Sequence, residues 1–366
     1  MQSVSKRGQG FGSKNPKLSL TPCEARPFAS YCFVKIELML KMWFSGSTPE
    51  ARIRSSSKMK KYLSVILAIL IIVAAGVYVS KHFDDVRDIL SISFESLLIL
   101  LSLALTEILL NGYSVRILLR SFGVKLSFHE WFGLSSVTTM ANFLLPFRGG
   151  MGIRAMYLKS KFDFPLTSFL STIAASYVIH LLIRSFIGMV SFILLYMYYD
   201  IFSVPIFILI AAVFGTLMSL VFIAARLPKL KNKYLARIND IVRGWQIITG
   251  NKKLLIELTV LFLSFSFVAI LIIYFSFKAL SINLTVLQSC VISCLNFLVS
   301  LLSVTPGAIG LSEAVIAFSS NLFGVILTQA IIAAALRRSI ILLVVFILGP
   351  IYSFALIGKE VSTQKG

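Results

Sequence analysis

Uninterrupted apolar runs of about 20 residues constrain this chain more than any other feature of its sequence. As a helix, a run of that length crosses a hydrocarbon core roughly 30 Å thick. Hydrophobic residues make up 57% of the chain, whereas soluble domains contain roughly 45–50%. The sequence therefore predicts an all-α, polytopic integral membrane protein and excludes a soluble one.

The apolar runs predict six full spans, near 62–80, 92–115, 166–198, 204–225, 254–277 and 328–356. Two further apolar stretches, 130–161 and 284–325, are interrupted. The interruptions contain Pro146, Gly149 and Gly150 in the first stretch, and Pro306, Gly307 and Gly310 in the second. Proline removes a backbone donor, and glycine weakens a helix. Because such a break survives at membrane depth only where it faces protein or water, we expect two re-entrant hairpins or broken helices.

The distribution of basic residues predicts the orientation. Loop 226–253 contains a strong excess of Lys and Arg with Asp240 as its only acidic residue before Glu257, and the loop after 92–115 contains Arg116, Arg120 and Lys125. The positive-inside rule places both loops and both termini in the cytoplasm. The formal net charge of +20 is thus explained by loops that face anionic lipid, and we expect no nucleic-acid binding.

With this orientation, the first broken segment opens from the cytoplasmic side and the second from the outer side. The order of span, broken segment and span therefore occurs twice, in opposite orientations. This is the inverted-repeat plan of many transporters, whose paired breaks mark the substrate site. We expect a transmembrane domain over 59–358, with the first span outside the repeat, and a short cytoplasmic tail over 359–366.

The N-terminal region 1–58 is polar and contains four prolines. Met59, Lys60 and Lys61 precede the first apolar run, which is how many bacterial membrane proteins begin. We expect translation to start at Met59, with 1–58 as a mis-called extension; the alternative is a disordered cytoplasmic arm. The run over 62–80 is longer than the apolar region of a usual signal peptide, which favours an uncleaved span.

No cofactor is expected from the motifs. Cys290 and Cys294 lie on one helix face, but a zinc site would need two further soft ligands nearby. Buried apolar thiols are the simpler interpretation. The chain also lacks the phosphate-binding pattern G-x-x-x-x-G-K-[ST]. Transport would then depend on ion coupling, a downhill gradient or a partner.

Charged residues inside apparent spans predict a polar pathway. A central charge opposes membrane insertion by about 2.5–3.5 kcal/mol, so such residues usually face a polar interior. Glu95 and Glu257 lie near span ends and can reach the interface. The residues expected along a substrate path are Asn142, Glu107, His180, Arg184, Glu313 and Arg337. The alternative is structural ion pairing between spans, with His180 and Arg184 on one helix face either as a proton relay or as a structural pair.

Two segments carry a resemblance to a known family. The first is Asn142-Phe-Leu-Leu-Pro-Phe-Arg148-Gly-Gly-Met-Gly-Ile-Arg154, and the second is Thr305-Pro-Gly-Ala-Ile-Gly-Leu-Ser-Glu313, followed by Arg337 in the next span. Together they resemble the flippase-like transmembrane region of lysylphosphatidylglycerol synthases, the multiple peptide resistance factor proteins. The resemblance covers roughly 60–356.

The resemblance implies lipid translocation between leaflets of the plasma membrane. Family members often have an acidic residue where this chain has Met151, and Arg148 and Arg154 suit a lipid phosphate instead of a cationic headgroup. In the full synthases a soluble C-terminal domain transfers lysine to the lipid. This sequence ends about ten residues after its last span, so we expect no transferase activity despite the family name.

Three functions follow from these patterns. The leading one is a transporter of a phospholipid or a polyprenyl-phosphate-linked lipid, which works by alternating access. The second is a membrane partner that docks a separate soluble transferase through loop 226–253. The third is an intramembrane enzyme acting on a lipid headgroup, for which Glu107 and His180 are the only imaginable acid–base pair.

Overall fold

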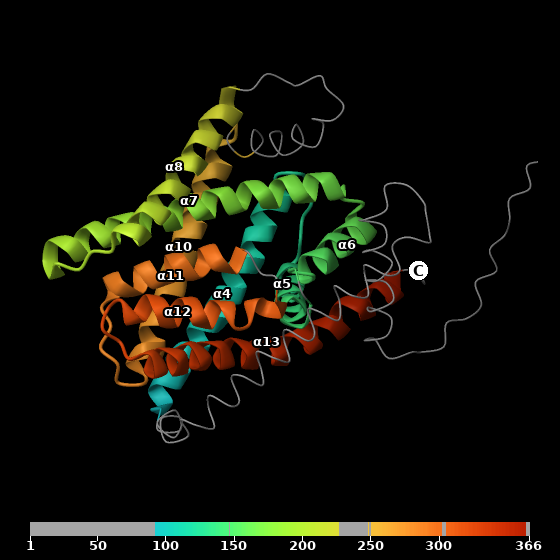
Figure 1. Ribbon diagram of the computed structural model, residues 1–366. Coiled ribbons are helices and arrows are strands. Elements are labelled where there is room, and N and C mark those ends of the chain that lie inside the picture. Colours follow the sequence, from blue (N-terminus) through green and yellow to red (C-terminus); the bar gives the residue numbers. More distant parts are fainter. Residues whose placement is uncertain (1–91, 146, 227–247, 249, 302–304, 364–366) are drawn as a thin grey trace, which may run out of the picture. The chain divides into compact units, whose positions relative to one another are not determined.

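The computed structural model describes residues 92–145, 147–226, 248, 250–301 and 305–363, and every element within these ranges is a helix (Figure 1). The prediction of an all-α, polytopic membrane protein is confirmed. Some predictions lie outside the described residues. These concern the N-terminal region 1–58, the start at Met59, the span 62–80, Pro146, most of loop 226–253 and the end of the tail.

Five helices in the described part of the chain are long and apolar enough to cross a membrane. They are α4 (Phe94–Arg120), α7 (Leu166–Tyr199), α8 (Val204–Arg226), α10 (Lys252–Lys278) and α13 (Leu327–Thr363). The shortest of them, α8, has 23 residues, which gives a length of about 35 Å. The predicted boundaries of these five spans agree with the observed helices to within a few residues, except where α4 and α13 extend further at their C-terminal ends.

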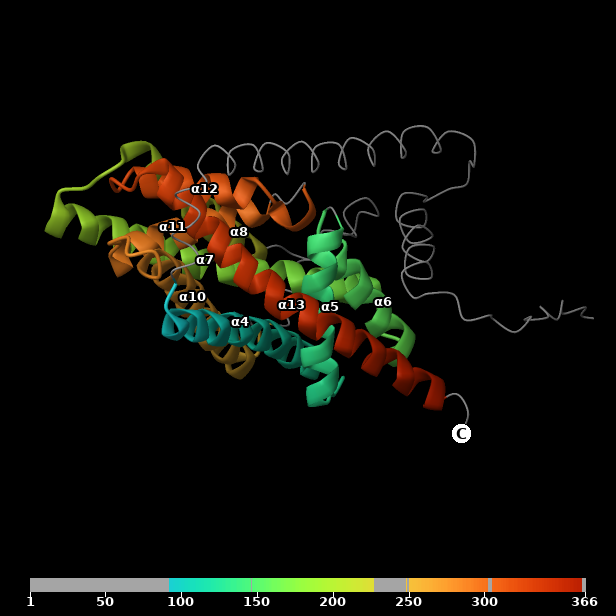
Figure 2. The ribbon, with the colours of Figure 1, turned by 90° about the horizontal axis from the view of Figure 1, so that it is seen from below.

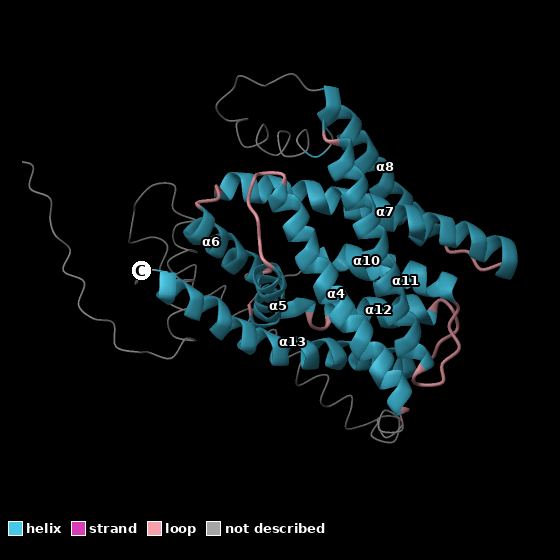
Figure 3. Cartoon of the chain, turned by 180° about the vertical axis from the view of Figure 1, so that it is seen from behind, coloured by secondary structure: helices cyan, strands magenta, loops and turns pink. Residues whose placement is uncertain are grey.

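Both predicted interruptions are present. In the first, α5 (Phe128–Leu144) ends before the break and α6 (Gly150–Phe162) follows it. In the second, α11 (Val286–Leu301) is followed by the short 3-10 helix η3 (Pro306–Ala308) and then by α12 (Leu311–Asn321). Helices α11, α12 and α13 lie side by side (Figure 3).

The two halves of the repeat, α4 to α7 and α10 to α13, match in detail. Helices α4 and α10 contain 27 residues each. Each is followed by a tight turn with one left-handed residue, Gly123 at φ 81° and Ser281 at φ 57°. The next helices start with the same cap, in which a backbone N–H donates to a side chain three residues later, at Ser127–Glu130 and Thr285–Gln288. The repeat predicted from the breaks therefore extends to the connecting turns.

The broken segment of each half packs against the last span of the other half. Helix α5 packs against α13, α11 packs against α7, and α4 packs against α10 (Figure 2). Arg120 at the end of α4 forms an ion pair with Glu257 near the start of α10, and Ile117 shares an apolar cluster with Leu254. Helices α4 and α10 are thus antiparallel, as an inverted repeat requires.

Small residues allow close helix contacts at equivalent interfaces of the two halves. A Cβ added to Gly188 of α7 would lie 2.9 Å from the Cys294 Sγ of α11, and one added to Gly349 of α13 would lie 2.5 Å from the Met140 Sδ of α5. In membranes, such close packing replaces the hydrophobic driving force between helices. The glycines therefore allow the close contacts of α7 with α11 and of α13 with α5.

Large apolar side chains are exposed on the outer faces of the spans, for example Ile208, Phe222 and Phe354. Exposure of such residues on long apolar helices is the arrangement that lipid solvates. The chain is therefore a membrane protein, while the plasma membrane and the cytoplasmic termini remain predictions.

Candidate functional site

The first break is formed by a left-handed turn and a close helix contact. Phe147 and Arg148 both have φ 53°, a conformation that non-glycine residues seldom adopt. A Cβ on Gly150 would lie 2.1 Å from the Thr138 backbone oxygen. Glycine therefore allows the start of α6 to approach α5 closely.

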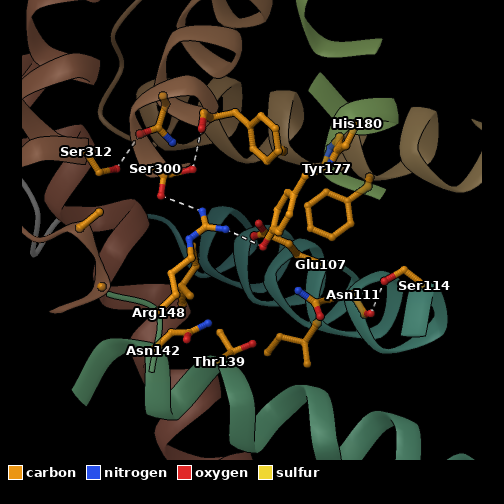
Figure 4. A pocket seen from close by; sticks show the side chains of 18 of the residues that line it. Glu107, Asn111, Ser114, Thr139, Asn142, Arg148, Tyr177, His180, Ser300 and Ser312 are labelled. Carbon is orange, nitrogen blue, oxygen red and sulfur yellow. Dashed lines mark hydrogen bonds between the residues drawn. The ribbon is translucent and has the colours of Figure 1, made fainter. Parts of the chain in front are cut away.

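Arg148 connects this break to both halves of the molecule. Its Nη1 donates to the Tyr177 hydroxyl of α7 at 2.5 Å, and its Nη2 donates to the Ser300 backbone oxygen of α11 at 2.7 Å (Figure 4). Both partners are neutral groups. The guanidinium thus fastens the first break to a helix of the second half without a counter-ion among these partners.

Arg154, one turn into α6, is 3% exposed. Its Nε donates to the Thr138 hydroxyl at 3.2 Å, and its Nη2 donates to the Asn111 side-chain oxygen at 2.9 Å. These contacts join α6 to α5 and α4. Since both acceptors are neutral, they satisfy hydrogen bonds of Arg154 but leave its charge uncompensated.

The second break is held by an ion pair. Gly307, Ala308 and Gly310 have φ values of 59°, 53° and 83°. The Glu313 carboxylate accepts from the Gly310 N–H at 2.8 Å and pairs with Arg338. Arg338 also donates to the Gly307 oxygen at 2.8 Å. The sequence placed Glu313 on a substrate path or in an ion pair between spans; in the structure it pairs with Arg338 of α13.

His180 and Arg184 lie on one face of α7, as expected from their spacing. Arg184 Nε donates to His180 Nε2 at 3.2 Å, and its Nη1 donates to the Ser293 hydroxyl of α11 at 2.7 Å. The imidazole lies among Phe262, Phe265 and Phe297. In this arrangement His180 acts as a hydrogen-bond acceptor, so its Nε2 carries no proton.

The predicted polar residues converge on one cavity of about 310 Å³ between the two halves. Each water occupies about 30 Å³ in the liquid, so the cavity has space for roughly ten waters or a polar headgroup. Seven of the predicted residues line it: Glu107, Asn142, Arg148, Arg154, His180, Arg184 and Arg337. Gly307 lines it as well, and Glu313 contributes through Arg338.

Sequence reasoning missed several polar residues that line the same cavity, including Asn111, Tyr177, Asn296 and Ser300. Three of them had a recognisable signal. Asn111 and Asn296 are amides within apolar helices, and polar groups there usually face a polar interior. Tyr177 lies one turn before His180 and two turns before Arg184 on α7, so it shares their face.

Positive charge dominates the cavity. Its lining includes five arginines (Arg148, Arg154, Arg184, Arg337 and Arg338) and the single carboxylate of Glu107. Adding Glu313, which pairs with Arg338, leaves an excess of three positive charges. Glu107 makes no ion pair within 4.0 Å in the described part of the chain, although it lies close enough to interact electrostatically with Arg184.

The two acidic residues near span ends lie outside the cavity. Glu257 pairs with Arg120, and Glu95 is exposed in the first turn of α4. Cys290 and Cys294 are free thiols. Within the described ranges, no group of three or more His, Cys, Asp or Glu side chains could hold a metal ion.

Comparison with known proteins agrees with the resemblance seen in the sequence. The family described as "Lysylphosphatidylglycerol synthase TM region" matches residues 64–349. The chain therefore belongs to this family. No curated protein and no solved structure matches it significantly.

Proposed function

We propose that this member of the lysylphosphatidylglycerol synthase transmembrane-region family binds the phosphate of a membrane lipid in the arginine-lined cavity and moves the lipid between leaflets. The observation that carries the proposal is the excess of three positive charges between the membrane helices. On insertion scales, three unpaired arginines would oppose insertion by roughly 8–10 kcal/mol in the absence of water and counter-ions. A bound phosphate would supply the missing negative charge.

Arginine suits this role because its planar guanidinium binds phosphate through two parallel hydrogen bonds. Arg148 and Arg154, the residues expected to hold the phosphate, both line the cavity. Arg148 now uses both terminal nitrogens on Tyr177 and Ser300. A phosphate bound by Arg148 would replace these contacts and release the first break from α7 and α11.

The repeat offers a mechanism for translocation. Each break is fastened across the repeat boundary: Arg148 reaches α11, whereas Gly307 packs on Phe143 of α5. Alternate release of the Arg148 contact and the Gly307 contact would expose the cavity first to one side of the membrane and then to the other. In this mechanism, binding is coupled to opening because the same arginine serves both.

The test is a leaflet-exchange assay with the full chain in liposomes. Headgroup-labelled phosphatidylglycerol, its lysyl ester and a polyprenyl phosphate would be followed by quenching from one side. We expect protein-dependent exchange that Arg148→Gln abolishes and Arg120→Gln preserves, since Arg120 is an exposed arginine outside the cavity. Absence of exchange for all three lipids, with folded monodisperse protein, would reject transport and favour docking of a separate transferase.

A further inference from the structure

Two of the arginines without an ion-pair partner lie where α7 and α13 face the cavity. Arg184 of α7 is 5% exposed and contacts only neutral groups, His180 and Ser293, through its described hydrogen bonds. Arg337 of α13 makes no hydrogen bond or ion pair with any described residue, and its Nε is buried. Both guanidiniums line the same cavity, where they repel each other electrostatically. They form a pair of cations without a counter-ion of their own.

The carboxylates of the cavity do not neutralise this pair. Glu313 is committed to Arg338 and to the Gly310 N–H. Glu107 interacts with Arg184 from beyond ion-pair distance and supplies one negative charge. A headgroup with its own cation would therefore meet more repulsion than attraction here.

We propose that the cavity selects a lipid whose phosphate carries more than one negative charge, a phosphomonoester or a diphosphate, and that Arg184 and Arg337 bind it together with Arg148. This inference rests on the proposed function, since it names the class of lipid that the same cavity takes. A phosphodiester carries one charge and leaves two positive charges uncompensated. A phosphomonoester carries about −1.5 to −2 at pH 7 and offers three terminal oxygens, enough for the forks of two arginines.

The competing substrates are distinguished by charge alone when their acyl chains are identical. Phosphatidic acid is a phosphomonoester, phosphatidylglycerol is a phosphodiester, and the lysyl ester of phosphatidylglycerol carries a net positive headgroup. Binding to the full chain in detergent would be measured by displacement of labelled phosphatidic acid at pH 8. We expect phosphatidic acid to bind about tenfold more tightly than phosphatidylglycerol, and the lysyl ester to bind most weakly.

Two controls tie the preference to charge and to the arginine pair. At pH 5 a phosphomonoester carries one charge, so the ratio between phosphatidic acid and phosphatidylglycerol should fall towards one. Both lipids experience the same protonation of the protein, so a change in the ratio reports the ligand. Arg337→Gln should reduce the ratio at pH 8 to about threefold or less, and Arg120→Gln should leave it unchanged.

Equal affinity for phosphatidic acid and phosphatidylglycerol at pH 8, measured on the unaltered chain, would overturn the inference even if no variant could be purified. A preference that persists in folded Arg337→Gln would overturn the assignment of the arginine pair. The leaflet-exchange assay separates this inference from the proposed function. Exchange without charge preference would reject the substrate class alone, whereas charge-selective binding without exchange of any lipid would reject translocation alone.

Discussion

Substitution of Gly150 by alanine tests whether the first break depends on close contact between α6 and α5. The added Cβ would lie 2.1 Å from the Thr138 oxygen, 2.6 Å from the Asn142 side-chain oxygen and 2.9 Å from the Asn142 nitrogen. Two of these three atoms belong to the backbone of α5, so no side-chain rotation can relieve the clash. The helices must separate instead.

The expected magnitude is the difference between two effects. Overpacking of a tight contact usually destabilises by about 1–3 kcal/mol, and alanine gains up to about 1 kcal/mol over glycine in a helix. We therefore expect a net loss of about 1–2 kcal/mol. Because Arg154 bonds to Thr138 across the same contact, separation of the helices should also reduce leaflet exchange.

The matched control is Gly215→Ala in α8, where an added Cβ would meet nothing within 4 Å. That variant should be as stable as the parent chain or slightly more stable. The measurement is the free energy of unfolding in mixed micelles during titration with a denaturing detergent. Equal stability of Gly150→Ala and Gly215→Ala would refute the argument that backbone contact requires glycine in the first break.

Three further perturbations follow from the same geometry. Glu313→Gln should destabilise the chain by about 3 kcal/mol because it leaves Arg338 without its counter-ion. Adding Arg338→Gln should recover part of this loss in the same unfolding assay. Additive losses from the two substitutions would contradict a direct ion pair. Glu130 and Lys161 form an ion pair at 2.5 Å at the two ends of the first broken segment. Burial opposes ionisation of Glu130, but the hydrogen bonds from Lys161 and Ser127 outweigh the effect of burial and lower the pKa of Glu130. The contribution of this pair, less than about 1 kcal/mol, should therefore be complete above pH 4.5 and disappear as the pH falls through the lowered pKa, whereas an unaltered acid profile of stability in Glu130→Gln would contradict this. Ser281→Gly should stabilise by about 0.5–1 kcal/mol, since Ser281 is left-handed at the position equivalent to Gly123; a loss of stability on unfolding would show that the serine side chain matters more than its backbone strain.

The spans and breaks were predictable because their signals are local. An apolar run of span length and a proline or glycine within it each act on the helix that contains them. The inverted order then followed from the loop charges and from the chain trace. No comparable local signal existed for the turns around Gly123 and Ser281, where one half uses glycine and the other serine.

The partners of the arginines were not predictable because they depend on tertiary packing. Arg337 and Arg338 are neighbours in the sequence but point about 100° apart around α13, and only the position of Glu313 decides that Arg338 is paired. Arg148 bonds to a backbone oxygen on α11, 152 residues away. Every residue has a backbone carbonyl, so the sequence does not indicate which one Arg148 contacts, and this contact could be found only in the structure.

The two halves share a scaffold but not its charges. Tyr177 and Arg338 occupy the same position, the twelfth residue, in α7 and α13, and each fastens the break of its own half: Tyr177 bonds Arg148, whereas Arg338 bonds Gly307. Arg154 and Val315 are likewise both the fifth residue of α6 and α12. A symmetric scaffold allows two equivalent states that open to opposite sides. In the proposed mechanism, the unequal charges would give both states a single phosphate site, and arginines without an equivalent in the other half, such as Arg154, would determine which lipid binds.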